Sequence, residues 1–271
     1  MTASELHSTM KLTYVRVLAA EWLKLRTQRG FTWATVTALV VAAMVSALGG
    51  ALLREEWATD PAGAFDTAVS APASSIGIAG LIFGLGLCTW LAGEFVSGSN
   101  YLSLLVIPKR RLVFSARLGL VSILAVAFGG AAALIGFGSA LLFVGAERMA
   151  PVVSDAAFWI NVVMTLVVSV SLVLLYFAAA TLTRRSLPAV GLMAVLFFVM
   201  PNIAAAVSFL DGPRALSLIL GGFPGSLVTD VLMASSDDAN ATFGPIAASF
   251  LLVSWSVLLV SVSARRFARY E

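Results

Sequence analysis

Long apolar runs alternate with short polar segments along the whole of this 271-residue chain. The runs lack the period-two alternation of membrane β-strands, and a helix of about 20 residues is enough to cross a hydrocarbon core about 30 Å thick. The sequence therefore predicts an all-α integral membrane fold, a single transmembrane domain over residues 1–271. The six expected transmembrane helices are residues 31–53, 74–92, 118–144, 157–182, 187–210 and 243–263.

Composition agrees with a membrane protein. The mean hydropathy is +0.98 and only 11% of the residues are charged, which excludes an ordinary soluble surface. Cys88 is the only cysteine and lies inside the second run, so no intramolecular disulfide can form. A buried free thiol is more typical of packing than of reactive chemistry.

The basic residues predict the orientation. Fourteen of the 17 Lys and Arg residues lie before the first span or after the second, fourth and sixth, together with four acidic residues. The other connections hold three basic and ten acidic residues. Because positive residues stay in the cytoplasm, we expect a multi-pass plasma-membrane protein with both termini cytoplasmic. Basic residues at membrane boundaries have membrane lipids as natural partners, so we expect no nucleic acid.

Residues 214–233 are almost long and apolar enough to form a seventh span. A crossing there would move the basic C-terminal residues outside, against the charge pattern. The sequence "GGFPG" at 221–225 also interrupts any continuous helix. We therefore expect re-entrant or interfacial helices between the fifth and sixth spans.

The segment before the first span, residues 14–30, has helical periodicity. Its apolar stripe contains Tyr14, Val15, Leu18, Trp22 and Leu25, and the opposite face contains Arg16, Ala20, Glu21 and Lys24. This pattern predicts an amphipathic helix lying in the plane of the membrane interface. The alternative is a solvated basic flank that only orients the first span.

Small and polar residues mark several spans. Gly80 and Gly84 form a G-x-x-x-G pair, which is typical of close helix packing. Asn161, Thr165 and Ser169 recur every four residues on the fourth span, and Pro201 is expected to kink the fifth span beside Asn202. Two interpretations stay open for such polar positions: they line a substrate path, or they join helices by hydrogen bonds. The candidate path residues are Asn161, Thr165, Ser169 and Asn202.

Several kinds of chemistry are excluded by the residues present. No G-x-x-x-x-G-K-[ST] motif occurs, so we expect no nucleotide-binding site and no ATP hydrolysis by this chain. With one histidine, no His-based metal site or catalytic triad can be assembled. No acidic residue lies in the middle of a span, which argues against a proton or cation relay. We predict no enzyme activity, no catalytic residue and no directly bound cofactor or metal.

Two segments carry a family resemblance. "AAEWLKLRTQRGFTWATV" at 19–36 and "GEFVSGSNYLSLLVIPKRRLVFSARL" at 93–118, with six spans, resemble the permease subunits of bacterial ABC exporters of the second type. The resemblance implies an N-terminal elbow helix on the inner membrane surface and a cytoplasmic coupling helix between spans 2 and 3. It also implies a separate ABC ATPase subunit that binds ATP and Mg²⁺, and a second permease copy, as a homodimer or with a close paralogue.

The same resemblance implies which residues meet the ATPase. By position, Glu94 and Gly98 match the family's acidic residue and glycine, and residues 108–111 match its basic exit. Apolar side chains between them offer an anchor for a partner's groove; the alternative is that residues 102–107 sit in the interface as a membrane foot. The expected ATPase-contact residues are Glu94, Phe95, Gly98, Tyr101, Leu102, Leu105, Pro108, Lys109, Arg110 and Arg111.

These features together predict the membrane subunit of an ATP-driven exporter. Its substrate is open among drugs, lipids, peptides and glycans, because apolar spans suit all of them. One alternative is a non-transporting membrane scaffold or sensor, which needs no ATPase partner. Another alternative is a secondary transporter, which the missing intramembrane carboxylates disfavour.

Overall fold

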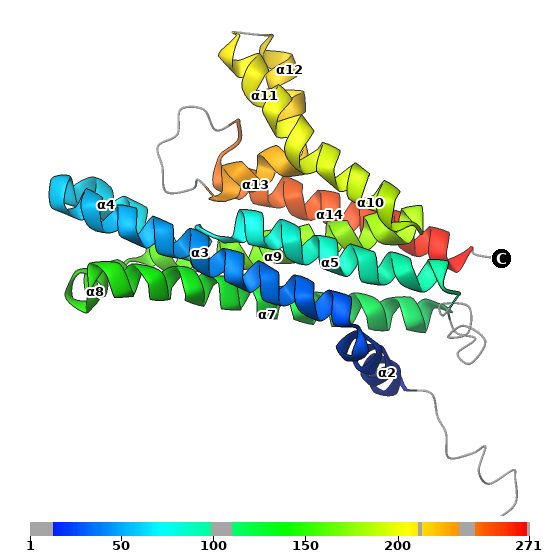
Figure 1. Cartoon of the computed structure of the whole chain (residues 1–271). Helices are drawn as coiled ribbons and strands as arrows, with labels where there is room; N and C mark the ends of the chain where they lie inside the picture. The colour runs from blue at the N-terminus through cyan, green and yellow to red at the C-terminus, as the bar shows by residue number, and fades with distance from the viewer. Residues whose placement is uncertain (1–12, 99–109, 211–212, 233–241, 270–271) are drawn as a thin grey trace, which may run out of the picture.

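Every secondary-structure element in the computed structural model is helical over the residues it describes, which are 13–98, 110–210, 213–232 and 242–269 (Figure 1). Six helical segments among the described residues are long and apolar enough to cross a membrane, in agreement with the six predicted spans, and a bent helix pair at 215–232 would add a seventh if it crossed as one span. They are α3 (Arg29–Thr59), η1 (Ala71–Ala73) with α5 (Ile76–Val96), α7 (Arg110–Val144), α9 (Ala156–Thr183), α10 (Ser186–Ala194) continued by η2 (Val195–Val199) and α11 (Met200–Phe209), and α14 (Pro245–Ala268).

Several of these helices are longer than the apolar runs from which they were predicted. Helix α7 has 35 residues, which corresponds to about 50 Å at 1.5 Å per residue. It starts with Arg110 and Arg111, and helix α3 runs on through Glu55 and Glu56. Hydropathy marks only the part of a helix that lipid covers, so the polar first and last turns were missed.

Helix α9 is the centre of the bundle and packs against α5, α7 and α14. Its residues from Val168 to Thr181 are mostly buried. The G-x-x-x-G pair of α5 faces it: a methyl group on Gly84 would overlap the ring of Tyr176, and Gly80 lies over Leu172. The glycines therefore serve the close approach of two helices.

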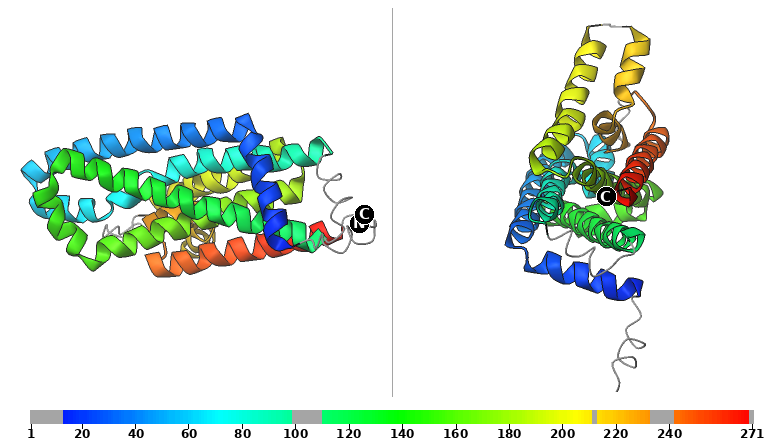
Figure 2. Two further views of the ribbon diagram at one scale, coloured as in Figure 1. Left: turned by 90° about the horizontal axis from the view of Figure 1, so that it is seen from below. Right: turned by 90° about the vertical axis from the view of Figure 1, so that its right-hand side faces the viewer.

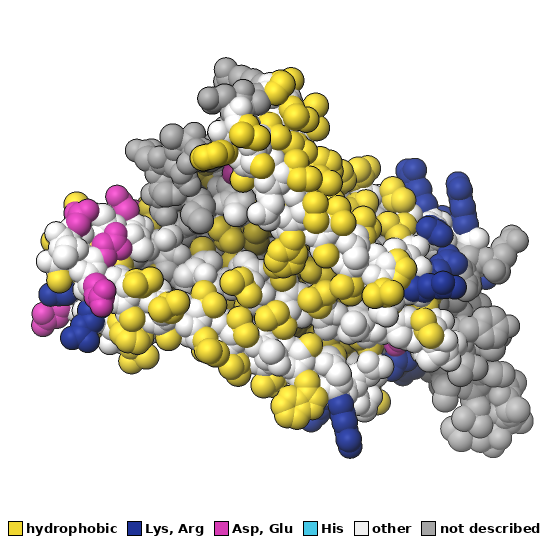
Figure 3. Space-filling view, turned by 45° about the horizontal axis from the view of Figure 1, so that its top comes forward, with side chains coloured by type: hydrophobic (Ala, Val, Ile, Leu, Met, Phe, Trp, Pro, Cys, Tyr) yellow, Lys and Arg dark blue, Asp and Glu magenta, His cyan; other side chains and the backbone are white. Residues whose placement is uncertain are grey.

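The two ends of the bundle differ in charge (Figure 3). The end formed by α4 (Pro61–Val69) and α8 (Ala146–Ser154) carries most of the described acidic residues, and we call it the acidic end. A small second core joins these two helices through Ala68, Met149 and Val152. The opposite, basic end carries Arg26, Arg29, Arg110, Arg111, Arg184, Arg185, Arg265, Arg266 and Arg269.

The fifth span is irregular where proline was expected to disturb it. A π-helical turn, η2, directly precedes Pro201, whose ring lacks the N–H that continues an α-helix. This span projects away from the rest of the bundle before the chain turns back through α12 (Arg214–Gly221) (Figure 1). Only 11% of the residues in its most apolar window are buried, against 61% for α9.

Helix α12 and helix α13 (Pro224–Leu232) meet at an angle of 83°, at the break predicted from "GGFPG". The indole Nε1 of Trp255 on α14 donates a hydrogen bond of 2.9 Å to the carbonyl of Gly222 in this bend. A Cβ on Gly225 would overlap the backbone of η2, so α13 packs directly on the irregular turn of span 5. How deeply this pair enters a membrane stays a prediction.

Helix α2 (Tyr14–Thr27) crosses the bundle near its basic end and packs on α7 (Figure 2). The close approach depends on Gly119, because a Cβ there would overlap the hydroxyl of Tyr14. The buried stripe is Val17, Glu21 and Leu25. The predicted faces were therefore partly wrong: Glu21 was assigned to the polar side, yet it points into the protein.

Candidate functional site

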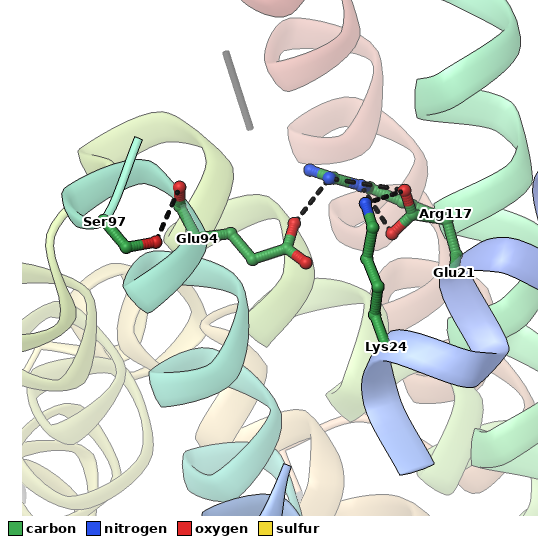
Figure 4. Close-up of polar contacts among 5 residues, drawn as sticks. All are labelled: Glu21, Lys24, Glu94, Ser97 and Arg117. Carbon is green, nitrogen blue, oxygen red and sulfur yellow. Dashed lines mark hydrogen bonds and ion pairs between the residues drawn. The ribbon is translucent and has the colours of Figure 1, made fainter. Parts of the chain in front are cut away.

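A cluster of four charged side chains joins three helices at the basic end (Figure 4). The guanidinium of Arg117 contacts two carboxylates: its Nε is 3.1 Å from Oε2 of Glu21, and its Nη2 is 2.5 Å from Oε2 of Glu94. The Nζ of Lys24 lies 2.8 Å from Oε1 of Glu21. We call Glu21, Lys24, Glu94 and Arg117 the Arg117 network.

The network draws on three helices, with Glu21 and Lys24 both on α2. Glu21 is one turn from both Val17 and Leu25, so it shares their face of α2 and is carried against α7. Glu94 lies in the last turn of α5, and Arg117 lies in the first turns of α7. The network thus ties the helix before span 1 to the end of span 2 and the start of span 3.

Burial makes this network costly to disrupt. Glu21 and Arg117 are 2% exposed and Glu94 is 4% exposed, whereas the side chain of Lys24 reaches the surface at 36%. Two carboxylates and two cations balance one another, so no uncompensated charge is buried among the four. Removal of one partner from a buried ion pair typically costs 3–5 kcal/mol.

The Arg117 network includes residues from both helices that flank the predicted coupling helix, α5 before it and α7 after it. Helix α5 ends at Val96, and Gly98 follows with φ +73°, a left-handed conformation that glycine adopts without strain and that commonly closes a helix. Helix α7 begins at Arg110. The chain between them, residues 99–109, lies outside the described residues. Arg117, two turns into α7, ties this helix to the last turn of α5.

The predicted ATPase-contact residues fall into three groups. Glu94 points inward to Arg117, and the Phe95 ring lies 6.5 Å from Phe267 of α14. Gly98 is in the turn after α5, Arg110 is half-buried, and Arg111 is exposed. The remaining five, Tyr101, Leu102, Leu105, Pro108 and Lys109, lie outside the described residues.

The predicted elbow-helix residues are all on α2, but they do not share one environment. Leu25 is buried and Leu18 is half-buried against the main core. Tyr14 and Trp22 are exposed, and the Tyr14 hydroxyl donates to the Ser115 carbonyl at 3.3 Å. Exposed aromatic side chains with a polar tip suit a membrane interface.

The four polar residues proposed to line a substrate path do not form one surface. Three are on α9 and the fourth is on span 5. Asn161, Thr165 and Ser169 are buried within the bundle, and the Ser169 hydroxyl donates to the Ala125 carbonyl of α7 at 2.7 Å. That bond is the one expected when polar groups join helices. Asn202 is exposed on span 5, where its amide donates to the Phe198 carbonyl at 2.6 Å.

Sequence reasoning missed the pairing of Glu21 with Arg117, which are 96 residues apart. One local signal was available. Glu21 stands between Val17 and Leu25 at the four-residue spacing of a buried helix face, so a carboxylate there requires a cationic partner. Nothing in the sequence says that this partner is Arg117.

A bundle with six candidate spans and clustered basic residues at one end defines a multi-pass membrane protein. The family model described as "ABC-2 family transporter protein" matches residues 17–201 of this chain. The chain therefore belongs to the ABC-2 transporter family, as its resemblance predicted. The match includes the Arg117 network and spans 1 to 4. Neither a curated protein nor a solved structure matches the chain.

Family membership fixes the general role. The protein is a membrane permease of an ABC transporter, a membrane transport subunit and not the ATPase, and its family implies an ABC ATPase as partner.

Proposed function

We propose that this chain is the permease of an ATP-driven exporter in the bacterial plasma membrane, moving a drug, lipid, peptide or glycan outward. ATP and Mg²⁺ bind in the separate ATPase subunit. The charge separation supports this orientation, because the basic end with its clustered arginines belongs on the cytoplasmic side with both termini. The ATPase therefore approaches the end that carries the Arg117 network.

The observation that carries the proposal is the bridge from Glu21 through Arg117 to Glu94. Residues 94–107 form the coupling segment, and its two roots are the end of α5 and the start of α7. Because both roots are tied to each other and to α2 by buried ion pairs, a force on the segment moves three helices together. Without these ties the same force would bend one helix end locally.

Within this mechanism the predicted contact residues have two roles. Glu94 is a positioning residue, since its carboxylate is occupied by Arg117 and buried. Phe95 likewise packs inward near Phe267. Direct contact with the ATPase falls to residues 101–105 and, in the basic exit, to residues 108–110. Arg111 is exposed beside them and lines a separate pocket.

The substrate path lies, in this proposal, between two permease copies. Support comes from span 5, which leaves Phe198, Val199 and Ile203 exposed along a helix that the monomer hardly covers. Asn202 is on this open helix, so it stays a candidate path residue. Asn161, Thr165 and Ser169 serve packing, because their hydrogen bonds are made inside the monomer.

The α12–α13 pair forms the re-entrant part of the outer leaflet in the proposed topology. Its bend is fixed by Trp255, and α13 packs on η2 through Gly225. A movement of span 5 is thereby transmitted to the outer end of the path.

The test is ATPase coupling in a reconstituted complex. The permease is co-expressed with candidate ABC ATPase subunits from the same organism and placed in proteoliposomes, and ATP hydrolysis is measured with and without permease. Glu94→Gln and Arg117→Lys should assemble with the ATPase but lose most of the permease-dependent change in hydrolysis. A lysine ammonium cannot reproduce the forked contact of a guanidinium with two carboxylates.

The matched controls are Glu147→Gln and Arg148→Lys, the same chemical changes at the acidic end. They should behave as the wild type. Size-exclusion profiles and melting temperatures separate uncoupling from misfolding. Wild-type coupling in both network variants would refute the transmission role, and failure of any ABC ATPase to associate would refute the proposed function itself.

A further inference from the structure

A pocket of about 730 Å³ opens at the basic end, between the first turns of α7 and the last turns of α14. It is separate from the Arg117 network, which faces α2 and α5. Its walls combine three arginines with aromatic and small apolar side chains. The lining residues are Arg111, Phe114, Ala264, Arg265, Phe267, Ala268 and Arg269.

The floor of this pocket is apolar and aromatic. Phe114 and Phe267 are buried, and their ring centroids are 5.6 Å apart. Phe177 of α9 supports Phe114 from behind at 5.4 Å, and Phe95 of α5 supports Phe267 at 6.5 Å. Four helices therefore contribute to one aromatic cluster beneath the pocket.

The rim is strongly cationic. Arg111, Arg265 and Arg269 are exposed, and no ion pair among the described residues involves any of them. Three guanidinium groups around one pocket repel one another unless an anion joins them. Phosphate is the preferred partner, because its oxygens match the forked N–H groups of arginine in pairs.

The surroundings decide which phosphate compound fits. The pocket lies at the level of the basic helix ends, where lipid headgroups meet a membrane protein. Toward the middle of the membrane, α14 exposes Val257, Leu258 and Val262, a surface suited to acyl chains. We propose that this pocket binds the phosphate headgroup of an anionic phospholipid from the inner leaflet. The bound lipid stabilises the packing of α14 on α7. On α7 the contact includes Phe114, which is three residues before Arg117.

The experiment measures lipid binding by the purified permease alone, so its result does not depend on the ATPase. Native mass spectrometry counts retained phosphatidylglycerol and phosphatidylcholine, and the melting temperature is followed as each lipid is added to detergent-purified protein. The test variant is Arg111→Gln with Arg265→Gln and Arg269→Gln. The control, Arg26→Gln with Arg54→Gln and Arg148→Gln, removes the same charge away from the pocket.

We expect the wild type and the control to retain phosphatidylglycerol and to melt higher with it than with phosphatidylcholine. The pocket variant should bind phosphatidylglycerol at least about tenfold more weakly and lose the difference in melting temperature. A second variant, Ala268→Phe, fills the pocket without changing charge and should also reduce retention. Its melting temperature without lipid shows whether the fold is intact.

Three outcomes would overturn the assignment. Equal phosphatidylglycerol retention by wild type and pocket variant would show that the arginines hold no lipid. If inorganic phosphate alone reproduced the stabilisation, and the pocket variant abolished it, the ligand would be a free anion. Unchanged lipid binding, combined with loss of ATPase co-purification in a separate co-expression, would assign the arginines to the protein partner instead.

Discussion

Nη2 of Arg117 lies 2.5 Å from Oε2 of Glu94, with both side chains almost completely buried. These residues are on consecutive membrane-spanning helices, and the polypeptide between them contains the segment proposed to dock on the ATPase. Their contact closes that stretch into a loop with a fixed base. Glu21 extends the same base to α2, so the base joins three helices.

The stability of this base can be measured by removing its centre. Arg117→Ala leaves Glu21 and Glu94 buried near each other without their cation, so we expect destabilisation by about 3–5 kcal/mol. Lys24→Ala removes a partly exposed partner of Glu21 and should cost no more than about 1 kcal/mol. Unfolding of the detergent-purified variants gives both values. Equal, small effects would mean that the Arg117 contacts contribute little to the fold.

Helix packing around α9 predicts a second effect. Gly84→Ala places a methyl group inside the ring of Tyr176, so we expect a loss of about 1–3 kcal/mol of stability. Gly130→Ala, on α7, meets no atom within 4 Å and should be close to neutral. The melting temperatures of the two variants measure this difference in stability. A neutral Gly84→Ala would contradict the close approach of α5 to α9.

The orientation is tested by accessibility from outside the cell. In a Cys88→Ser background, Asp60→Cys at the acidic end should react with a membrane-impermeant maleimide on intact cells. Arg110→Cys and Arg269→Cys should react only after lysis, because the proposed topology places the basic end in the cytoplasm. Labelling of Arg269→Cys on intact cells would reverse the proposed topology.

Span 5 offers a test of the second permease copy. Phe198→Cys, on the face left open by the monomer, should form an intermolecular disulfide under mild oxidation in membranes. Leu142→Cys is also exposed but lies on α7 near the acidic end, and it should remain monomeric. Cross-linking at Leu142 with none at Phe198 would place the interface elsewhere.

The existence of the six spans was predictable from hydropathy alone, because each apolar run is about as long as a helix that crosses the hydrocarbon core. The break at "GGFPG" was predictable for a similar reason, since glycine and proline disrupt a helix locally. The irregular turn before Pro201 follows from the same chemistry. All of these depend on residues near one another in the chain.

The site depends on contacts between distant residues, and there the sequence was less informative. Glu21 was placed on the wrong face of its helix because a charged residue normally faces water, and its burial is explained only by Arg117. Glu94 was found through its family pattern, but its inward direction was not. The aromatic cluster of Phe95, Phe114 and Phe267 likewise joins three helices that no local pattern relates.

The central claim is that the segment between α5 and α7 receives the ATPase. A photoreactive benzoylphenylalanine in place of Leu102 tests it directly in the co-expressed complex, with the same group at Leu142 as the control. Upon irradiation, the account predicts a covalent adduct between the Leu102 variant and the ATPase and none from Leu142. An assembled complex in which the Leu102 variant reacts only with lipid would contradict the account and would identify the segment as a membrane foot.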